Sequence, residues 1–236
     1  MKTVGLLGGM SWESTLTYYQ GLNRGIRDRL GGLHSARCLL ASVDFAEVER
    51  MQERGDWAEA GGYLANWARH LEAGGAECLV LCTNTMHRVI DDIGAAVSIP
   101  ILHIAEGTAD ALQADGIDTV GLLGTRYTME QDFYRSVLEE RGLTVLVPDE
   151  HGRTVVHDII YNELCLGKVL DHSRQQYISI VETLKQNGAQ AVILGCTEIG
   201  LLLDEQTSPL PVYDTTLLHV EAALDWALKP TEPACA

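Results

Sequence analysis

The sequence is short of positive charge and of long apolar runs. It carries 17 Lys and Arg against 33 Asp and Glu in 236 residues, which gives a formal net charge of −16. Because phosphate-rich partners require a basic patch, we expect neither nucleic acid nor a membrane surface as a partner. No apolar run approaches the roughly 18 residues of a membrane span, and the N-terminal MKTVGLLGGM lacks a signal-peptide layout. We therefore expect a cytoplasmic protein.

Metal and dinucleotide motifs are also missing. The six cysteines form no CxxC pair and show no metal-ligand spacing, and the GxGxxG fingerprint is absent. These absences predict no metal and no cofactor, and they favour thiols in a reducing compartment. Hydrophobic residues make up 46% of the chain and charged residues 21%, as in a typical soluble globular protein.

What the chain does contain is a repeat. The segment TVGLLG at Thr3–Gly8 recurs letter for letter at Thr119–Gly124. The segment GAECLVLCTNT, which begins at Gly75, aligns without a gap with GAQAVILGCTE, which begins at Gly188. In this alignment Thr83 stands where Cys196 stands. The pattern is that of one duplicated half-domain.

The repeat predicts an α/β protein with two pseudo-symmetric Rossmann-like lobes, each a short parallel sheet flanked by helices. We expect the first lobe at residues 1–104 plus 215–228, the second lobe at 105–214, and a disordered tail at 229–236. The last helix, which matches the helix after Ile104 in the repeat, is expected to pack on the first lobe.

Apolar periodicity and turn residues locate the individual elements. Ser11 is expected to cap the first helix. Strands are expected at 2–7, 38–43, 77–82, 100–104, 119–123, 143–147 and 212–213, and a further buried strand is expected in the stretch 189–198, where the apolar run stops at Gly195. Helices are expected at 12–30, 46–54, 63–73, 105–114, 129–141, 155–164, 173–187 and 215–228, with a glycine-containing break between the second and the third.

Four loops follow parallel strands and are expected to meet at the carboxyl edges of the sheets, lining a cleft between the lobes. They are residues 8–11, 83–87, 124–128 and 196–198. Cys196 lies beyond its strand, between Gly195 and a Thr-Glu pair, which favours a functional role over a core cysteine. Thr83 and Cys196 then approach a ligand from opposite sides, an arrangement suited to moving a proton from one face of a carbon to the other. The neutral donors around them fit an amino acid better than a phosphate: Asn84, Thr85, Thr125, Thr128 and Thr197.

Other polar and thiol side chains have simpler interpretations. Cys78 and Cys82 are expected in the core, and His87 is expected to cap its helix. His103 and His219 are expected to be structural, and the arginines near the loops are expected to be surface charges, although one of them could meet a distal carboxylate: Arg50, Arg54 and Arg126.

Four ordered motifs, GGMSWEST, LCTNTMH, LLGTRYTM and LGCTEIGLL, make the chain resemble the aspartate/glutamate racemase family. The resemblance implies cofactor-independent racemisation by two bases on opposite sides of the α-carbon, with Thr83 and Cys196 as the catalytic pair. It also implies a homodimer, for which Trp57 and Trp67 offer apolar surface, although burial of Trp67 in the core is the favoured interpretation. Most members carry two cysteines, so the chain is most similar to the threonine/cysteine branch specific for L-aspartate and L-glutamate. The implied substrate-binding residues are Met10, Gln52, Asn84, Thr85, Thr125, Thr128, Thr197 and Glu198.

One departure concerns a lysine of many members, which is replaced by Cys165, with Lys168 out of register. We expect an amino-acid racemase acting on aspartate and/or glutamate. The alternatives are a related proton-shuttling decarboxylase or cis-trans isomerase, and a non-catalytic amino-acid-binding relic. Cys196 must be partly thiolate to act, and we expect loop amides to stabilise that charge. A threonine hydroxyl is too weak an acid to serve unaided as a base, so the two enantiomers should differ in kcat and KM, with the L form favoured.

Overall fold

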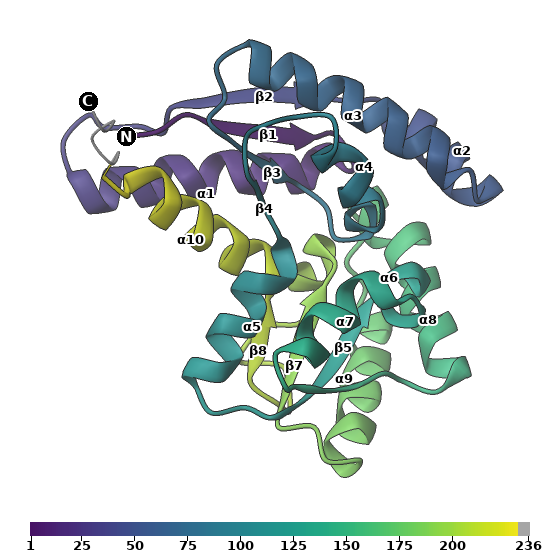
Figure 1. Cartoon of the computed structure of the whole chain (residues 1–236). Helices are drawn as coiled ribbons and strands as arrows, with labels where there is room; N and C mark the ends of the chain where they lie inside the picture. Colours follow the sequence, from purple (N-terminus) through teal and green to yellow (C-terminus); the bar gives the residue numbers. More distant parts are fainter. Residues whose placement is uncertain (231–236) are drawn as a thin grey trace. The chain divides into compact units, whose positions relative to one another are not determined.

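The structure, a computed structural model, describes residues 1–230 and divides the chain into two compact units (Figure 1). Unit 1 consists of Met1–Cys82, Val89–Leu102 and the chain from His219 onward, and unit 2 consists of Thr83–Arg88 and His103–Leu218. Most of the predicted tail at 229–236 lies outside the described residues.

Each unit is built on a four-stranded parallel sheet, and the two sheets share one topology. The strand order is β2-β1-β3-β4 in unit 1 and β6-β5-β7-β8 in unit 2. The two copies of TVGLLG form β1 and β5, each of which pairs with two neighbours. This equivalence confirms the predicted duplication and the predicted fold class. The strands are β1 Val4–Gly8, β2 Cys38–Ser42, β3 Cys78–Leu81, β4 Ile101–Leu102, β5 Thr119–Gly124, β6 Thr144–Leu146, β7 Ala191–Gly195 and β8 Val212–Asp214.

Helices flank both sheets, and most begin at a side chain that accepts a backbone N–H, as N-terminal caps do. Ser11 caps α1 as predicted, since its side chain accepts from the Ser14 amide. The helices are α1 Trp12–Leu30, α2 Phe45–Arg54, α3 Trp57–Ala73, α4 Ile90–Gly94, α5 Ile104–Ala114, α6 Arg126–Glu130, α7 Asp132–Glu140, α8 Glu150–Asn162, α9 Asp171–Gln186 and α10 Thr215–Leu228. Three 3₁₀ turns complete the list: η1 Thr85–Val89, η2 Leu164–Leu166 and η3 Thr197–Leu201.

One part of the core of unit 1 lies where α1 and α10 pack together against a face of the sheet (Figure 1). Val4 and Leu6 of β1 are buried there with Val220 and Leu224 of α10. The approach of the two helices requires glycine at position 25, because an added Cβ would lie 2.2 Å from a methyl group of Leu224. The predicted docking of the last helix on the first lobe is thus confirmed.

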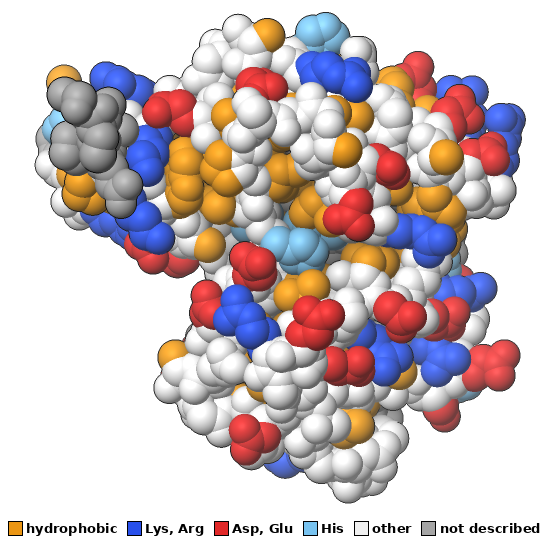
Figure 2. Space-filling model, viewed as in Figure 1, with side chains coloured by type: hydrophobic (Ala, Val, Ile, Leu, Met, Phe, Trp, Pro, Cys, Tyr) orange, Lys and Arg blue, Asp and Glu red, His pale blue; other side chains and the backbone are white. Residues whose placement is uncertain are grey.

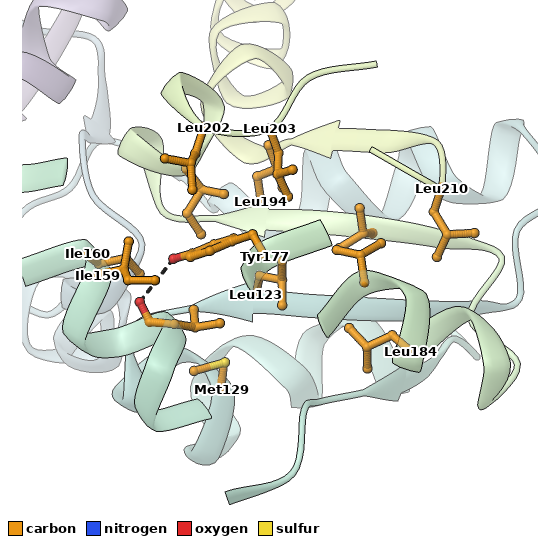
Figure 3. Packing of buried hydrophobic residues seen from close by; sticks show 14 of the residues in the cluster. Leu123, Met129, Ile159, Ile160, Tyr177, Leu184, Leu194, Leu202, Leu203 and Leu210 are labelled. Atoms are coloured by element: carbon orange, nitrogen blue, oxygen red, sulfur yellow. Dashed lines mark hydrogen bonds between the residues drawn. The ribbon is translucent and has the colours of Figure 1, made fainter. Parts of the chain in front are cut away.

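The core of unit 2 covers both faces of its sheet, because alternate residues of a strand point to opposite sides. Leu122 and Ile193 pack with α5 and α7. Leu123 and Leu194 pack on the other side with α8 and α9 (Figure 3). Tyr177 of α9 is fully buried in this second cluster, and its hydroxyl donates to the Val156 carbonyl at 3.0 Å.

The boundaries between the units differ from the predicted ones at residues 83–88, 103–104 and 215–218, all of which belong to unit 2. Residues 83–88, expected in the first lobe, belong to unit 2, because their side chains and backbone bond to unit 2. The first turn of α10 also belongs to unit 2, since the hydroxyl of Thr215 donates to the Leu194 carbonyl at 2.9 Å.

The expected glycine-containing break between the second and third helices is present at Gly55 and Asp56, but it does not extend to residue 62 as predicted. Helix α3 starts at Trp57 and runs through Gly61 and Gly62. Gly61 lacks a side chain because α4 is close: an added Cβ would lie 2.4 Å from a carboxylate oxygen of Asp92. The glycine therefore permits helix packing and does not end a helix.

Two other helices begin earlier than predicted because a cap was missed. The side chain of Thr125 accepts from the Thr128 amide and starts α6, which ends at Gln131, whose extended backbone (φ −101°, ψ 155°) separates it from α7. The predicted single helix at 129–141 is therefore two helices. Asp149 likewise caps α8 by accepting from the Gly152 amide at 2.7 Å, so this helix starts at Glu150.

The surface carries interspersed acidic and basic side chains on the visible face of each unit (Figure 2). Trp57 and Trp67, expected to offer apolar surface, are only partly exposed. More exposed apolar side chains are found on α1 and β2, where Trp12 is 63% exposed and Leu40 48%. Among residues 1–230, no helix combines the length and the apolar character needed to cross a membrane.

Candidate active site

The candidate site lies at the carboxyl edge of the unit 2 sheet, where segments that follow β5 and β7 meet residues 83–88. Ligands of open parallel α/β sheets bind at this edge. Of the ten predicted site residues, eight belong to unit 2 and two, Met10 and Gln52, belong to unit 1. The eight are Thr83, Asn84, Thr85, Thr125, Thr128, Cys196, Thr197 and Glu198.

Cys196 follows β7 directly and has an extended backbone (φ −151°, ψ 132°). Its thiol donates a hydrogen bond to Oε2 of Glu198 at 3.0 Å. The Glu198 side chain is only 6% exposed, so a buried carboxylate lies within proton-transfer distance of the sulfur. Glu198, predicted to bind substrate, thus contacts the proposed base itself.

Burial raises the pKa of the Cys196 thiol well above its ordinary value, and the negative charges of Glu198 and Cys165 raise it further. A backbone amide at Glu198 lowers the pKa, but this contribution is outweighed. The expected stabilisation of the thiolate by a loop amide is thus present at Glu198, but burial and the neighbouring charges outweigh it in the ligand-free protein. Formation of the Cys196 thiolate therefore requires a proton acceptor, and the Glu198 carboxylate is the adjacent one.

Asn84 is held by one half of its amide only. Its Nδ2 donates at 3.0 Å to the hydroxyl of Thr215, at the start of α10. Its Oδ1 is buried and has no hydrogen-bond partner among the described residues. Because an unsatisfied buried acceptor is costly, this oxygen is suited to accept from a ligand ammonium group.

Three threonine hydroxyls form a chain beside it. The hydroxyls of Thr85 and Thr125 lie 3.0 Å apart, and those of Thr125 and Thr128 lie 3.2 Å apart. All three side chains are buried. Such a chain can present a hydroxyl donor to a carboxylate and can reorient without any change of charge.

Thr83, the predicted partner of Cys196, is 9% exposed, and its carbonyl oxygen lies 2.8 Å from Nδ1 of His87. His87 therefore binds the backbone of Thr83, and its other ring nitrogen accepts from the amide of Ile104. His219 is structural, as predicted, because its ring joins the Tyr18 hydroxyl to the Leu102 carbonyl.

The two unit 1 residues lie near the end of β1 and on α2. Met10 and Gln52 are both buried, with 5% and 4% of their side chains exposed. Gly9 has a left-handed backbone (φ 94°), and its amide donates to the hydroxyl of Thr15 at 2.8 Å. The sequence alone does not predict the hydrogen bond between Gly9 and Thr15, because Thr15 lies inside α1.

The arginines considered for a distal carboxylate are all exposed, as their default interpretation predicted: Arg50, Arg54 and Arg126. Sequence reasoning missed Thr215, whose only signal was its position at the start of the last helix. It also missed Cys165 as a neighbour of the site; this residue packs against the same apolar cluster as Cys196. Among the described residues, no three His, Cys, Asp or Glu side chains are grouped so as to hold a metal.

Comparisons with known proteins identify the family to which this chain is similar. A model of the Asp/Glu/hydantoin racemase family matches residues 7–223. A Yersinia pestis protein, described as a candidate Asp/Glu racemase, is 52% identical; the match covers 97% of this chain and 100% of that one, with a TM-score of 0.91. An aspartate racemase homologue from Pyrococcus horikoshii is 32% identical, with coverage of 96% and 99% and a TM-score of 0.83.

A curated relative, the broad-specificity amino-acid racemase of Bacillus subtilis, is 29% identical over 153 residues, which are 65% of this chain and 66% of that protein. The family model covers most of the chain, and the first of the solved structures is similar over its whole length. The chain therefore belongs to the Asp/Glu/hydantoin racemase family.

Proposed function

We propose that the protein is an isomerase, a cofactor-independent racemase of aspartate and/or glutamate, in which Cys196 and Thr83 exchange protons with the α-carbon. The observation that carries this proposal is the partly buried thiol–carboxylate pair, with 3.0 Å between Sγ of Cys196 and Oε2 of Glu198. In this pair the Glu198 carboxylate can accept the thiol proton of Cys196, and the thiolate that results is the base.

Cys196 acts after its proton has moved to the Glu198 carboxylate, which leaves a thiolate and a carboxylic acid. The thiolate then takes the α-proton of the substrate and becomes a thiol again, and the electron pair of the broken C–H bond stays on the α-carbon. Acting in reverse, the thiol returns a proton to the carbanion. Transfer from a hydrogen-bonded group at this distance is typical of general acid–base catalysis.

Thr83 serves the opposite face of the α-carbon. A threonine hydroxyl does not ionise near neutral pH, so it donates its proton to the carbanion while it takes another from a bound water. The hydroxide left behind is neutralised by the proton held on Glu198, transferred through bound water, which restores the Glu198 carboxylate. This assignment keeps Thr83 neutral throughout the reaction.

Substrate is held by neutral groups and not by a cluster of positive charge. The unpaired Oδ1 of Asn84 accepts from the α-ammonium group, and the hydroxyl chain of Thr85, Thr125 and Thr128 donates to a carboxylate. Met10, Gln52 and Thr197 are assigned to substrate binding on the family resemblance. The L enantiomer, a homodimeric assembly and a cytoplasmic location complete the proposal.

One-sided proton chemistry, such as decarboxylation or cis-trans isomerisation, is the second candidate. It is favoured by the presence of a thiol at only one of the two strand ends. Such an enzyme would exchange or transfer a proton through Cys196 without inverting the α-carbon.

The test is to incubate the purified protein with each enantiomer of aspartate and glutamate in D₂O. Racemase activity predicts deuterium at the α-carbon together with appearance of the opposite enantiomer, measured by NMR and chiral chromatography. Exchange without inversion favours the second candidate, and binding without exchange favours an amino-acid-binding relic. A folded protein that neither exchanges nor binds these amino acids contradicts the proposal.

A further inference from the structure

The side chain of His87 is fixed by two backbone groups. Its Nδ1 lies 2.8 Å from the carbonyl oxygen of Thr83, and its Nε2 lies 3.2 Å from the amide nitrogen of Ile104. The ring is 1% exposed. Because a carbonyl only accepts and an amide N–H only donates, the ring must carry its proton on Nδ1 and a lone pair on Nε2. The contacts therefore select one neutral tautomer.

These hydrogen bonds fix the segment at Thr83, which lies outside the helices and strands. Thr83 lies between the end of β3 and the turn η1, and the backbone amide of His87 also donates to the Asn84 carbonyl at 3.1 Å. The contacts that attach Asn84 and Thr85 to unit 2 are made through their side chains. The His87 ring contacts the backbone of Thr83 itself and joins it to the first residue of α5.

The repeat contains no equivalent of this ring at the other strand end. When Thr83 is aligned with Cys196, His87 falls on Gly200. An added Cβ at Gly200 would lie 3.0 Å from a carboxylate oxygen of Asp214, so this position has little room for a side chain. The backbone after β3 is therefore hydrogen-bonded to the His87 side chain, whereas Cys196 is fixed by the hydrogen bond from its thiol to Glu198.

We propose that His87 is a positioning residue that places Thr83 for proton transfer at one face of the α-carbon. The proposal rests on the proposed racemase function. A hydroxyl that relays a proton depends on its geometry, and a displacement of about 1 Å can lower a rate by about 10²-fold. Loss of the His87–Thr83 bond should therefore impair the Thr83 face and spare the Cys196 face.

The experiment compares His87→Asn with His87→Gln. An asparagine amide nitrogen reaches the position of Nδ1 and keeps the bond to the Thr83 carbonyl. A glutamine amide reaches the position of Nε2, so it keeps the contact with Ile104 and loses the bond to Thr83. His103→Asn is the matched control, because the His103 ring lies 4.7 Å from that of His87 and caps α5 through Nδ1.

The measurement is the ratio of α-deuterium exchange with retention to inversion, started from each enantiomer in D₂O. In His87→Gln we expect inversion to fall about 10²-fold. Exchange with retention should persist for the enantiomer whose α-proton faces Cys196. His87→Asn and His103→Asn should keep the wild-type ratio.

A proportional fall of exchange and inversion in His87→Gln, with unchanged circular dichroism, would show a general structural role and overturn the proposal. An unchanged ratio in that variant would also overturn it. Absence of both exchange and inversion in the wild-type protein contradicts the racemase function, and with it the role of His87. That outcome is distinguishable because it is seen before any substitution is made.

Discussion

The ends of β3 and β7 are the same position of the repeat, but they carry different chemistry. After β7, Gly195 lets the strand lie close to β5, because an added Cβ would be 2.8 Å from the Leu123 carbonyl oxygen. After β3 the equivalent residue is Cys82, which is fully buried, as predicted for a core residue. Burial raises the pKa of the Cys82 thiol far above its ordinary value. Burial also raises the pKa of Cys196, so the two cysteines differ in other ways: Cys82 is fully buried, whereas Cys196 is partly exposed and donates to a carboxylate.

The repeat also contains equivalent helix–helix contacts that are made by different residues in the two units. Tyr18 of α1 bonds to His219 of α10 at 2.9 Å, and Tyr134 of α7 bonds to Thr108 of α5 at 3.2 Å. Each pair joins a helix that lies between the first and second strands of one sheet to the helix that follows the last strand of the other sheet. The helix–helix hydrogen bond is thus kept in both units although its residues differ. The residues after β3 and β7, a threonine hydroxyl and a cysteine thiol, differ in acidity.

The largest expected effect comes from removing the thiol at the β7 end. Cys196→Ser should lower racemisation by about 10²–10⁴-fold, because a serine hydroxyl does not ionise near neutral pH and cannot take the α-proton. Polarimetry with both enantiomers measures the loss. Cys38→Ser, which changes a half-buried cysteine of unit 1, should keep its activity. Equal activity of Cys196→Ser and wild type would remove Cys196 from the mechanism.

The second test makes the two strand ends more alike. Thr83→Ala should lower inversion by about 10²-fold, whereas Thr83→Cys should raise turnover of the weaker enantiomer, since a thiol is a stronger acid than a hydroxyl. Chiral chromatography of initial rates measures both. Thr183→Ala, at an exposed position of α9, is the control. Full racemisation by Thr83→Ala in both directions would mean that residue 83 carries no proton.

The third test concerns a packing feature of unit 1. Gly25→Ala should lower the free energy of unfolding by about 1–3 kcal/mol, because its methyl group would overlap Leu224 of α10. Gly62→Ala in α3 meets no atom within 4 Å and should be neutral or stabilising by up to about 1 kcal/mol. Urea unfolding followed by circular dichroism compares the two. A Gly25→Ala protein as stable as wild type would mean that α1 and α10 pack less closely.

The smallest effect is a change in the acidity of Cys196. The Glu198 carboxylate raises the pKa of this thiol, so Glu198→Gln should lower that pKa, although burial still keeps it above the ordinary value. At a fixed pH below the thiol pKa, more thiolate is then present, and iodoacetamide should alkylate Cys196 faster. Peptide mass spectrometry across pH measures the rate. Glu205→Gln, at an exposed position, should leave the profile unchanged; a higher apparent pKa in Glu198→Gln would reverse the assigned role of the carboxylate.

The sequence by itself determined the two sheets and the residues that follow their strands. Apolar runs such as TVGLLG and AVILG are local signals, and their repetition placed Thr83 opposite Cys196 in the alignment. Helix ends were less accessible, because the caps at Thr125 and Asp149 and the close approach at Gly61 depend on single side chains or on a neighbouring helix.

Only the tertiary structure decided how the site residues are held and how acidic they are. Asn84 is hydrogen-bonded to Thr215, 131 residues away in the sequence, and the Ile104 amide to His87, 17 residues away. Local periodicity therefore predicts neither contact. The membership of residues 83–88 in unit 2 follows from those contacts. The raised pKa of Cys196 likewise arises from burial and from Glu198, because the energy of a charge depends on the groups that folding brings around it.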